Sequence, residues 1–557
     1  MEESYWIHNR PTRRRFLRGI GIAAGALTLA PAIAACRGGA RQGTGGNVRQ
    51  VSSGNGGGGA ARPVRGGTLT SSLGTDVSIL DYAYNFDLSS RAIIANCVEP
   101  LLAVDTQGQP TGLLATSWEN PDDRTYVFKL RPGVTFQDGT DFNADAVDYS
   151  LGRIRANKAS FQYPQLVSID KIEKPDQQSV KITLSGPNAP LLNNLTGNAG
   201  RVISPAIGEK YGGDRLRVDL TGQGTGPFKF VEWKSGDHVT LVRNERYWGR
   251  DASGTQLPYA DKLIYRVIPD GNQALASLRS GEIDAFQLAV GIQSAPPKDI
   301  AGLKADPSLS YRDRPSSTRL ALAFNEAKQP FGSKELRQAV CYAVDRAAIN
   351  HAAYFDTGLP LDVIFNPAIW TYDAAYHPYL KRNVARAKQL LVQAGRPDGF
   401  AFSLLANSAP PELPQAAELL KDQLKEVGID VTIQLVQAPA LVAAVNAGQH
   451  QVAYLIVTGG FDPDSWIYPA FSSKGANNSF THYNNPDVDR LLEQARTTLD
   501  PAARKPLYQQ AQKLIVDDAA VCVLLSPTVA ALSRANVHNL PLGPTPAVGA
   551  SQVWKSG

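Results

Sequence analysis

Two kinds of hydrophobic pattern follow one another along the chain, and the change comes near Arg319. Before that point, short runs in which apolar and polar residues alternate predict strands, for example TLTSSL (68–73), KITLSG (181–186) and HVTLVRN (238–244). A few helical patterns interrupt these runs. We therefore expect the region from 105 to about 310 to be rich in strands.

Three segments in this first region carry more specific predictions. SSRAIIANCVEPLLAV (89–104) has helical spacing and predicts one helix. YVFKLRPGVTF (126–136) predicts a hairpin that turns at Pro132-Gly133. NADAVDYSLGRI predicts a helix for which Asn143 is the N-cap.

Beyond Arg319 the spacing favours longer helices that alternate with strands. The predicted helices are KELRQAVCYAVDRAAIN (334–350), VARAKQLLVQAG (384–395), AAELLKDQLKEVG (416–428), VDRLLEQARTTL (488–499) and RKPLYQQAQKLIVDD (504–518), and the strands are FAFSLLAN (400–407), VTIQLVQ (431–437) and QVAYLIVTG (451–459). This alternation is typical of an α/β lobe. Two such lobes joined by a connection leave a cleft, which is the usual place for a ligand.

The first 36 residues have the layout of an export signal. Arginines precede an apolar stretch (19–35) of 17 residues, and a spanning helix needs about 20. TRRRFLR (12–18) resembles the twin-arginine export motif, and IAAC resembles a lipobox that ends at Cys36. We expect residues 1–36 to be a lipoprotein signal, cleaved so that an acylated Cys36 anchors the chain to the membrane. An uncleaved membrane anchor is the alternative.

Residues 37–65 have a composition that does not favour folding. They include ten glycines and five arginines but no acidic residue, and they are too poor in apolar residues to bury a core. A flexible tether of this length spans roughly 30 Å root-mean-square. We expect it to hold a folded body close to a membrane surface, and an inert insert is the alternative.

The formal charge of +5 arises in these N-terminal segments. Their ten arginines outnumber their two glutamates by eight, so the body from residue 66 onward carries −3. A protein that binds nucleic acid concentrates basic charge on its folded part. The charge distribution therefore argues against nucleic acid as a partner.

The three cysteines of the body, Cys97, Cys341 and Cys522, lie in or beside apolar runs. We expect buried free thiols, and one disulfide plus one thiol is the alternative in an oxidising compartment. The sequence has no CxxC pair and its seven histidines are scattered. It therefore predicts neither a metal site nor a cofactor.

The motifs that would indicate an enzyme are absent from the sequence. It contains no GxSxG, HExxH or GxxxxGK[ST]. DFNAD (141–145) begins like a calcium loop, but Ala146 and Gly152 stand where a glycine and a glutamate are needed, which favours a helix start. GQGTGP (222–227) favours a turn, because Pro227 removes a backbone donor that a phosphate loop would use.

GTGPFKFVEWKSGDHVTLVRNERYWG (224–249) resembles the signature segment of the family 5 extracytoplasmic solute-binding proteins, the dipeptide, oligopeptide and nickel receptors of ABC importers. Five further segments resemble the family in the same order: 96–105, 114–147, 322–349, 461–495 and 507–525. The resemblance extends from residue 66 to about residue 532.

This resemblance implies an α/β, two-lobed periplasmic-binding-protein type II fold with an additional inserted domain and the ligand in the interlobe cleft. The implied domains are a discontinuous lobe I (66–104, 216–315 and 526–557), an inserted domain II (105–215) and a lobe III (316–525). Such a receptor closes on its solute by a hinge motion. It would act as a monomer outside the cytoplasm, lipid-anchored to the cell membrane, and deliver solute to ABC permease subunits.

The resemblance also places a ligand site and shows where this chain departs from its relatives. In peptide-binding relatives, an aspartate three residues ahead of an acidic-Pro pair binds the peptide's α-amino group. Here the pair is Asp462-Pro463, and the anchor position is occupied by Gly459. An unpaired ammonium in a closed cleft is costly. Asp462 or Asp464 is a candidate replacement, although each is equally suited to cap the helix that follows.

The candidate ligand-binding residues of the second lobe are Thr458, Gly459, Gly460, Phe461, Asp462 and Trp466, and those of the first lobe are Asn85, Phe86 and Asp87. Gly459-Gly460 permits close backbone approach. Phe461 and Trp466 offer aromatic rings for stacking, with a core position as the alternative for each. Asp87 is either a relocated amine anchor or the N-cap of a helix.

Three functions remain open from the sequence. The first is an importer receptor for a peptide or peptide-like solute. The second is the same receptor for an oligosaccharide or other neutral solute, which would not need an ammonium group. The third, disfavoured by the missing catalytic motifs, is a secreted enzyme.

Overall fold

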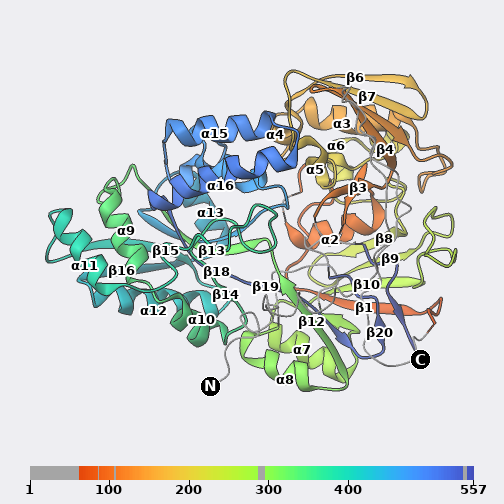
Figure 1. Cartoon of the computed structure of the whole chain (residues 1–557). Coiled ribbons are helices and arrows are strands. Elements are labelled where there is room, and N and C mark those ends of the chain that lie inside the picture. Colours follow the sequence, from red (N-terminus) through yellow and green to blue (C-terminus); the bar gives the residue numbers. More distant parts are fainter. Residues whose placement is uncertain (1–61, 86, 106–107, 287–294, 543–548) are drawn as a thin grey trace, which may run out of the picture. The chain divides into compact units, whose positions relative to one another are not determined.

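The computed structural model describes residues 62–85, 87–105, 108–286, 295–542 and 549–557 (Figure 1). Cys36, Phe86, the expected signal and most of the expected tether lie outside these described residues. Within the described ranges, every helix is too short or too polar to traverse a lipid bilayer.

A seven-stranded sheet collects strands from three separate stretches of the chain. Its order is β12 (Leu309–Pro315), β19 (Thr528–Arg534), β11 (Ala285–Phe286), β1 (Thr68–Leu73), β10 (Lys262–Val267), β9 (His238–Arg243) and β8 (Phe228–Lys234). β1 runs parallel to β10, whereas β19 runs antiparallel to β12. The alternating patterns at 68–73 and 238–244 thus form strands, as predicted.

Further elements accompany this sheet along the chain. They are α2 (Leu88–Cys97), α7 (Gly271–Ser280) and α8 (Ile300–Ala305), together with the paired short strands β2 (Leu102–Val104) and β3 (Pro110–Gly112), and β20 (Val537–His538) and β21 (Trp554–Lys555).

A four-stranded antiparallel sheet forms between residues 115 and 184. Its order is β4 (Ala115–Asp122), β5 (Thr125–Leu130), β7 (Ser179–Leu184) and β6 (Ile169–Asp176). The helices around it are α3 (Ala144–Arg155), α4 (Tyr163–Leu166), α5 (Leu191–Asn194) and α6 (Pro205–Leu216). One hydrophobic core joins this sheet to the seven-stranded sheet, because Phe128 and Val180 belong to the same cluster as Leu263.

A six-stranded sheet forms from the region where longer helices were predicted. Its order is β14 (Leu359–Pro360), β18 (Val521–Ser526), β13 (Thr318–Phe324), β17 (Val452–Thr458), β15 (Phe400–Asn407) and β16 (Ile429–Val436). Its helices are α9 (Lys334–Ala343), α10 (Arg346–Tyr354), α11 (Val384–Gln393), α12 (Glu412–Lys425), α13 (Ala438–Asn446), α14 (Asp464–Phe471), α15 (Pro486–Thr497) and α16 (Pro501–Asp517). Helix α12 packs on β15 and β16. This part has its own hydrophobic core.

The predicted helix 89–104 is only partly correct. α2 ends at Cys97, where Val98 adopts an extended conformation. Pro100 follows two residues later, and a proline disfavours helical geometry in the residue before it. After Pro100, the apolar residues Leu102–Val104 form the strand β2 and do not continue the helix.

Two other predicted elements differ in their pairing or length. Residues 126–136 do not form a hairpin, because β5 ends at Leu130 and pairs with β4 and β7. The helix predicted over 334–350 is two helices, α9 and α10. Asp345 caps the second by accepting a hydrogen bond from the Ala348 N–H at 2.9 Å. By contrast, Asn143 caps α3 as predicted.

The resemblance segment 224–249 has a structural reason for its composition. Glu99 is 5% exposed and accepts hydrogen bonds at 2.8 Å from three side chains of that segment: Thr225, Tyr247 and Trp248. Burial raises the pKa of Glu99. A buried carboxylate needs such donors, so the segment fixes the end of α2 to β8 and to the turn after β9.

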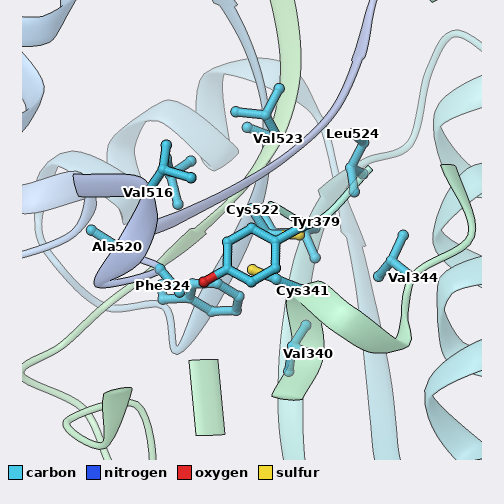
Figure 2. Close-up of a cluster of buried hydrophobic side chains, with 14 of the residues drawn as sticks. Phe324, Val340, Cys341, Val344, Tyr379, Val516, Ala520, Cys522, Val523 and Leu524 are labelled. Atoms are coloured by element: carbon cyan, nitrogen blue, oxygen red, sulfur yellow. The ribbon is translucent and has the colours of Figure 1, made fainter. Parts of the chain in front are cut away.

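All three described cysteines are buried free thiols, as predicted. Figure 2 shows the sulfurs of Cys341 and Cys522 close together among apolar side chains of the six-stranded part, with Phe324 and Tyr379 beside them. Burial raises the pKa of the Cys341 thiol.

Candidate functional site

The chain passes between the seven-stranded and six-stranded sheets at two places that lie side by side. These are residues 316–317, between β12 and β13, and Pro527, between β18 and β19. The Ser316 hydroxyl donates to the Pro527 carbonyl at 2.6 Å. Asn366 donates to the Ser526 hydroxyl at 2.8 Å and to the Ser316 carbonyl at 2.7 Å. Polar side chains thus join the two crossing strands.

The loop that contains the second-lobe candidates is anchored to this crossing. It follows β17 and precedes α14. The hydroxyl of Thr458 lies 3.1 Å from that of Thr318, and the Ser317 hydroxyl donates to the Gly459 carbonyl at 2.7 Å. Consequently, any displacement of the crossing strands acts directly on the loop.

Asp462 is fully engaged by a buried arginine. Its two carboxylate oxygens accept hydrogen bonds from Arg504 at 2.8 and 3.0 Å. One of them also accepts a hydrogen bond from the Asp464 N–H at 2.9 Å, in the first turn of α14. Asp462 therefore also accepts a hydrogen bond at the start of α14, where Pro463 is the N-cap residue, and its negative charge is compensated within the protein.

Asp464 lies in the same cluster. It is 3.3 Å from Arg496 and accepts a hydrogen bond from the Tyr508 hydroxyl at 3.2 Å. Burial raises the pKa of Asp464 to about 7. Both acidic residues of the loop thus lie among arginine and tyrosine side chains of α15 and α16.

On the first-lobe side, Asp87 caps α2, which was one of its two expected roles. One carboxylate oxygen accepts a hydrogen bond from the Ser90 N–H at 2.7 Å, and the other accepts from Ser78 at 2.5 Å and Asn85 at 3.1 Å. Asn85 is fully buried, and its side-chain oxygen accepts a hydrogen bond from Asn198 at 3.2 Å. The Asp87 carboxylate is thus already satisfied by protein donors.

The two aromatic candidates are buried. Phe461 is 2% exposed and Trp466 is 6% exposed. Trp466 belongs to the core of the six-stranded part and packs edge-on against Phe471, with ring centroids 5.1 Å apart. Phe461 lies against Gly108, where an added Cβ would come within 2.4 Å of the ring. Gly108 has φ +79°, so glycine is required there for both reasons.

The loop also meets the segment that follows the four-stranded sheet. A Cβ on Gly460 would lie 3.5 Å from the side-chain nitrogen of Asn193. The Ala189 N–H donates to the Arg496 carbonyl at 2.8 Å. Residues 108 and 193 thus lie at the loop, whereas residue 189 contacts the end of α15. Whether the candidate residues bind solute stays a prediction.

Sequence reasoning missed Arg319, which contacts two of the candidates. Its guanidinium lies over the Trp466 ring at 4.5 Å, and a Cβ on Gly459 would lie 3.2 Å from its Nη2. Burial lowers the pKa of Arg319 to about 9. The available signal was a lone arginine inside the otherwise apolar run RLALAF, because a charge in a buried strand needs a reason.

The comparisons with known proteins now identify the family. The sequence matches the family described as "Bacterial extracellular solute-binding proteins, family 5 Middle" over residues 109–479. The chain belongs to this family. The glutathione-binding protein GsiB of Escherichia coli (strain K12) is 31% identical over 457 residues, which are 80% of this chain and 86% of that protein. GsiB of Shigella flexneri is 30% identical over the same length.

Solved structures agree with this assignment to family 5. DppA from Helicobacter pylori in complex with the peptide STSA is 26% identical, with a TM-score of 0.76 over 89% of this chain and 99% of that chain. The binding protein AgaA from A. tumefacien R10, in complex with agropinic acid, is 27% identical, with a TM-score of 0.76 over 88% of this chain and 99% of that one. The expected type II periplasmic-binding-protein fold is confirmed.

Membership in family 5 also decides the functional class. The chain is an extracytoplasmic solute-binding receptor of the ABC-importer type and not an enzyme. The solute-binding prediction is therefore confirmed at this level.

Proposed function

We propose that this receptor is anchored by a lipid at Cys36 and captures a peptide-type solute between the segments 85–87 and 458–466. It then delivers the solute to the permease subunits of an ABC importer. Names among its relatives support a peptide-type solute, since GsiB binds glutathione and the H. pylori structure holds a peptide. The neutral-solute alternative rests only on the glycine at position 459.

The observation that carries this proposal is the hydrogen bond from the Ser317 hydroxyl to the Gly459 carbonyl, at 2.7 Å. It joins the candidate loop to the segment that connects the two large sheets. Residues 316–317 and Pro527 act as a hinge between a lobe III (316–525) and the rest of the body, which comprises lobe I (66–104, 216–315 and 526–557) and an inserted domain II (105–215). Rotation about this hinge separates the loop from residues 108 and 193 and admits the solute.

Small-angle scattering of the full-length protein tests the closure. We expect a smaller radius of gyration when a cognate solute, found by calorimetric screening of peptides and oligosaccharides, is added. A solute that binds without any change in the scattering profile would argue against a closing receptor.

Mass spectrometry of the exported protein tests the anchor. We expect residues 1–35 to be removed and acyl chains to be present on Cys36, which supply membrane affinity of about 0.8 kcal/mol per buried CH₂. Cys36→Ser should remain uncleaved or be released from the membrane, and export should fail in Arg13→Lys/Arg14→Lys. Recovery of an intact N-terminus on exported wild-type protein contradicts this assignment.

A further inference from the structure

Arg319, a buried arginine beside the candidate loop, lacks among the described residues the acidic partner that a buried cation usually has. Removing a guanidinium from water is costly unless a carboxylate compensates it. Arg504 follows this rule through Asp462. Arg319 has no acidic group near it among the residues that the structure describes. Arg91 and Arg201 form no direct ion pair with the described residues, although Asp87 attracts the first and Glu99 the second.

Arg319 presents the clearest case. It is 2% exposed, and its two terminal nitrogens donate to main-chain carbonyls, Nη1 to Ile364 at 2.9 Å and Nη2 to Ser317 at 3.0 Å. Its Nε–H has no acceptor among the described residues, and the same holds for the indole N–H of Trp466. Two neighbouring buried donors without acceptors indicate that a hydrogen-bond acceptor is missing there.

The first-lobe side also carries two arginines, Arg91 and Arg201, each attracted by one carboxylate, Asp87 and Glu99 respectively. Arg91 lies on α2, one turn after Asp87, and its buried Nε–H has no acceptor among the described residues. Arg201 is 4% exposed and donates to Asn198 at 2.9 Å and to the Val98 carbonyl. Burial and the charge of Arg91 lower the pKa of Arg201 to about 9.

The acidic groups nearby are already bound by other donors, and none of them lies beside Arg319. Asp87 is satisfied by three protein donors, and Asp462 is paired with Arg504. Glu99 accepts three hydrogen bonds of its own and has a raised pKa. Among these three arginines, Arg319 is therefore the one whose charge has no compensating acidic group among the described residues.

The glycine at position 459 leaves room for the positive charge of Arg319. A Cβ at position 459 would lie 3.2 Å from Arg319 Nη2, so the guanidinium occupies the space beside the position that the family resemblance assigns to an amine anchor. Among the described residues, this position thus faces a cation and no free carboxylate.

We propose that the solute is an acid and that one of its carboxylates accepts hydrogen bonds from Arg319 Nε and Trp466 Nε1, while Arg91 and Arg201 favour negative charge on the opposite side. This inference rests on the receptor function proposed above and narrows its solute to an acidic peptide or a related carboxylic acid. The solute reaches both donors while the loop is separated from residues 108 and 193.

Calorimetry on the unaltered protein tests the proposal with matched probes. These are trialanine, trialanine amide, N-acetyl-trialanine, glutathione, glutathione diethyl ester and maltotriose. A charge-assisted hydrogen bond corresponds to about ten- to a hundredfold in affinity. We expect each acid to bind about ten- to a hundredfold more tightly than its amide or ester, and N-acetylation to have little effect.

Variants assign the effect to the two donors. Arg319→Met should remove the difference between acid and amide, and Arg319→Lys should restore part of it. Trp466→Phe keeps an aromatic face but loses the N–H and should weaken acid binding by about two- to tenfold. Arg386→Met is the matched control, because the Arg386 side chain, on the surface of α11, donates only to Gln389 among the described contacts. Thermal unfolding of each variant verifies that it is folded.

The outcomes separate this inference from the receptor function. If an amide, an ester or maltotriose binds with closure as tightly as the acids, the acidic class is wrong and the receptor function stands. If N-acetylation abolishes binding, an amine anchor exists and the inference is overturned. The inference also fails if no probe of any charge binds and the added acids shift the unfolding temperature of the wild type no more than that of Arg319→Met.

Discussion

Two buried arginines of the same lobe flank the candidate loop, and they are held in opposite ways. Behind the loop, Arg504 forms two hydrogen bonds with Asp462, and Asp464 lies close by. Beside Gly459, the partners of the Arg319 guanidinium within the described part of the chain are two main-chain carbonyls and the face of Trp466. Arg346, also fully buried in this lobe, has no acidic partner among the described residues either, but its Nε and both terminal nitrogens reach main-chain carbonyls or the Cys522 sulfur. At Arg319 the Nε–H has no acceptor among the described residues, and this unsatisfied donor indicates where a partner arrives from outside the chain.

The largest expected effect tests the compensated arginine. Arg504→Met leaves the buried Asp462 carboxylate without its cation and should lower the free energy of unfolding by about 3–5 kcal/mol. Arg319→Met removes only hydrogen bonds to two carbonyls and should lower it by about 1–2 kcal/mol. Denaturant unfolding of both variants measures the difference. Equal losses would show that Arg319 is as much a structural residue as Arg504.

A second change adds a negative charge at position 459, beside Arg319. Gly459→Asp places a carboxylate beside Arg319 and compensates it within the protein. We expect the affinity for acidic solutes to fall about ten- to a hundredfold, as measured by calorimetry. Gly459→Asn, of nearly the same size but uncharged, is the matched control and should lose less. Equal losses of affinity in both variants would mean that the volume of the side chain at position 459, and not its charge, weakens the binding of acids.

The third effect concerns the pH dependence behind the loop. Burial raises the pKa of Asp464 from 3.8 to about 7, so the folded state keeps a proton that the unfolded state has lost between these values. This contribution to stability is full below pH 3.8 and declines as the pH rises toward 7, by up to about 1.4 kcal/mol per pH unit. Asp464→Asn should remove this decline. If the free energy of unfolding declined with pH equally in the wild type and in Asp464→Asn, the decline would not come from Asp464 and the prediction would be wrong.

The sequence predicted those features that depend on neighbouring residues. The cap at Asn143 requires only its own side chain and the next turn, and alternating strands such as 68–73 follow from a local pattern. The ordered resemblance segments identified the family and its fold. The single helix at 334–350 failed because Asp345 offered a second cap, which competes locally with continuation.

The site was less predictable because its character depends on contacts between distant segments. The sequence left Asp462 either as an amine anchor or as a helix cap, and its pairing with Arg504, 42 residues later, became visible only in the structure. Arg319 looked like one charge in a strand, and only its surroundings from residues 364 and 466 show that it lacks a partner. Long-range charge compensation of this kind leaves no local pattern.

The most direct test of this account is a crystal structure of the protein with the tightest-binding acid of the probe panel. The account predicts a carboxylate oxygen of the solute at about 2.7–3.2 Å from both Arg319 Nε and Trp466 Nε1. A solute bound in the site with these two donors still lacking an acceptor, or held through its ammonium group by Asp87 or Asp462, would contradict it.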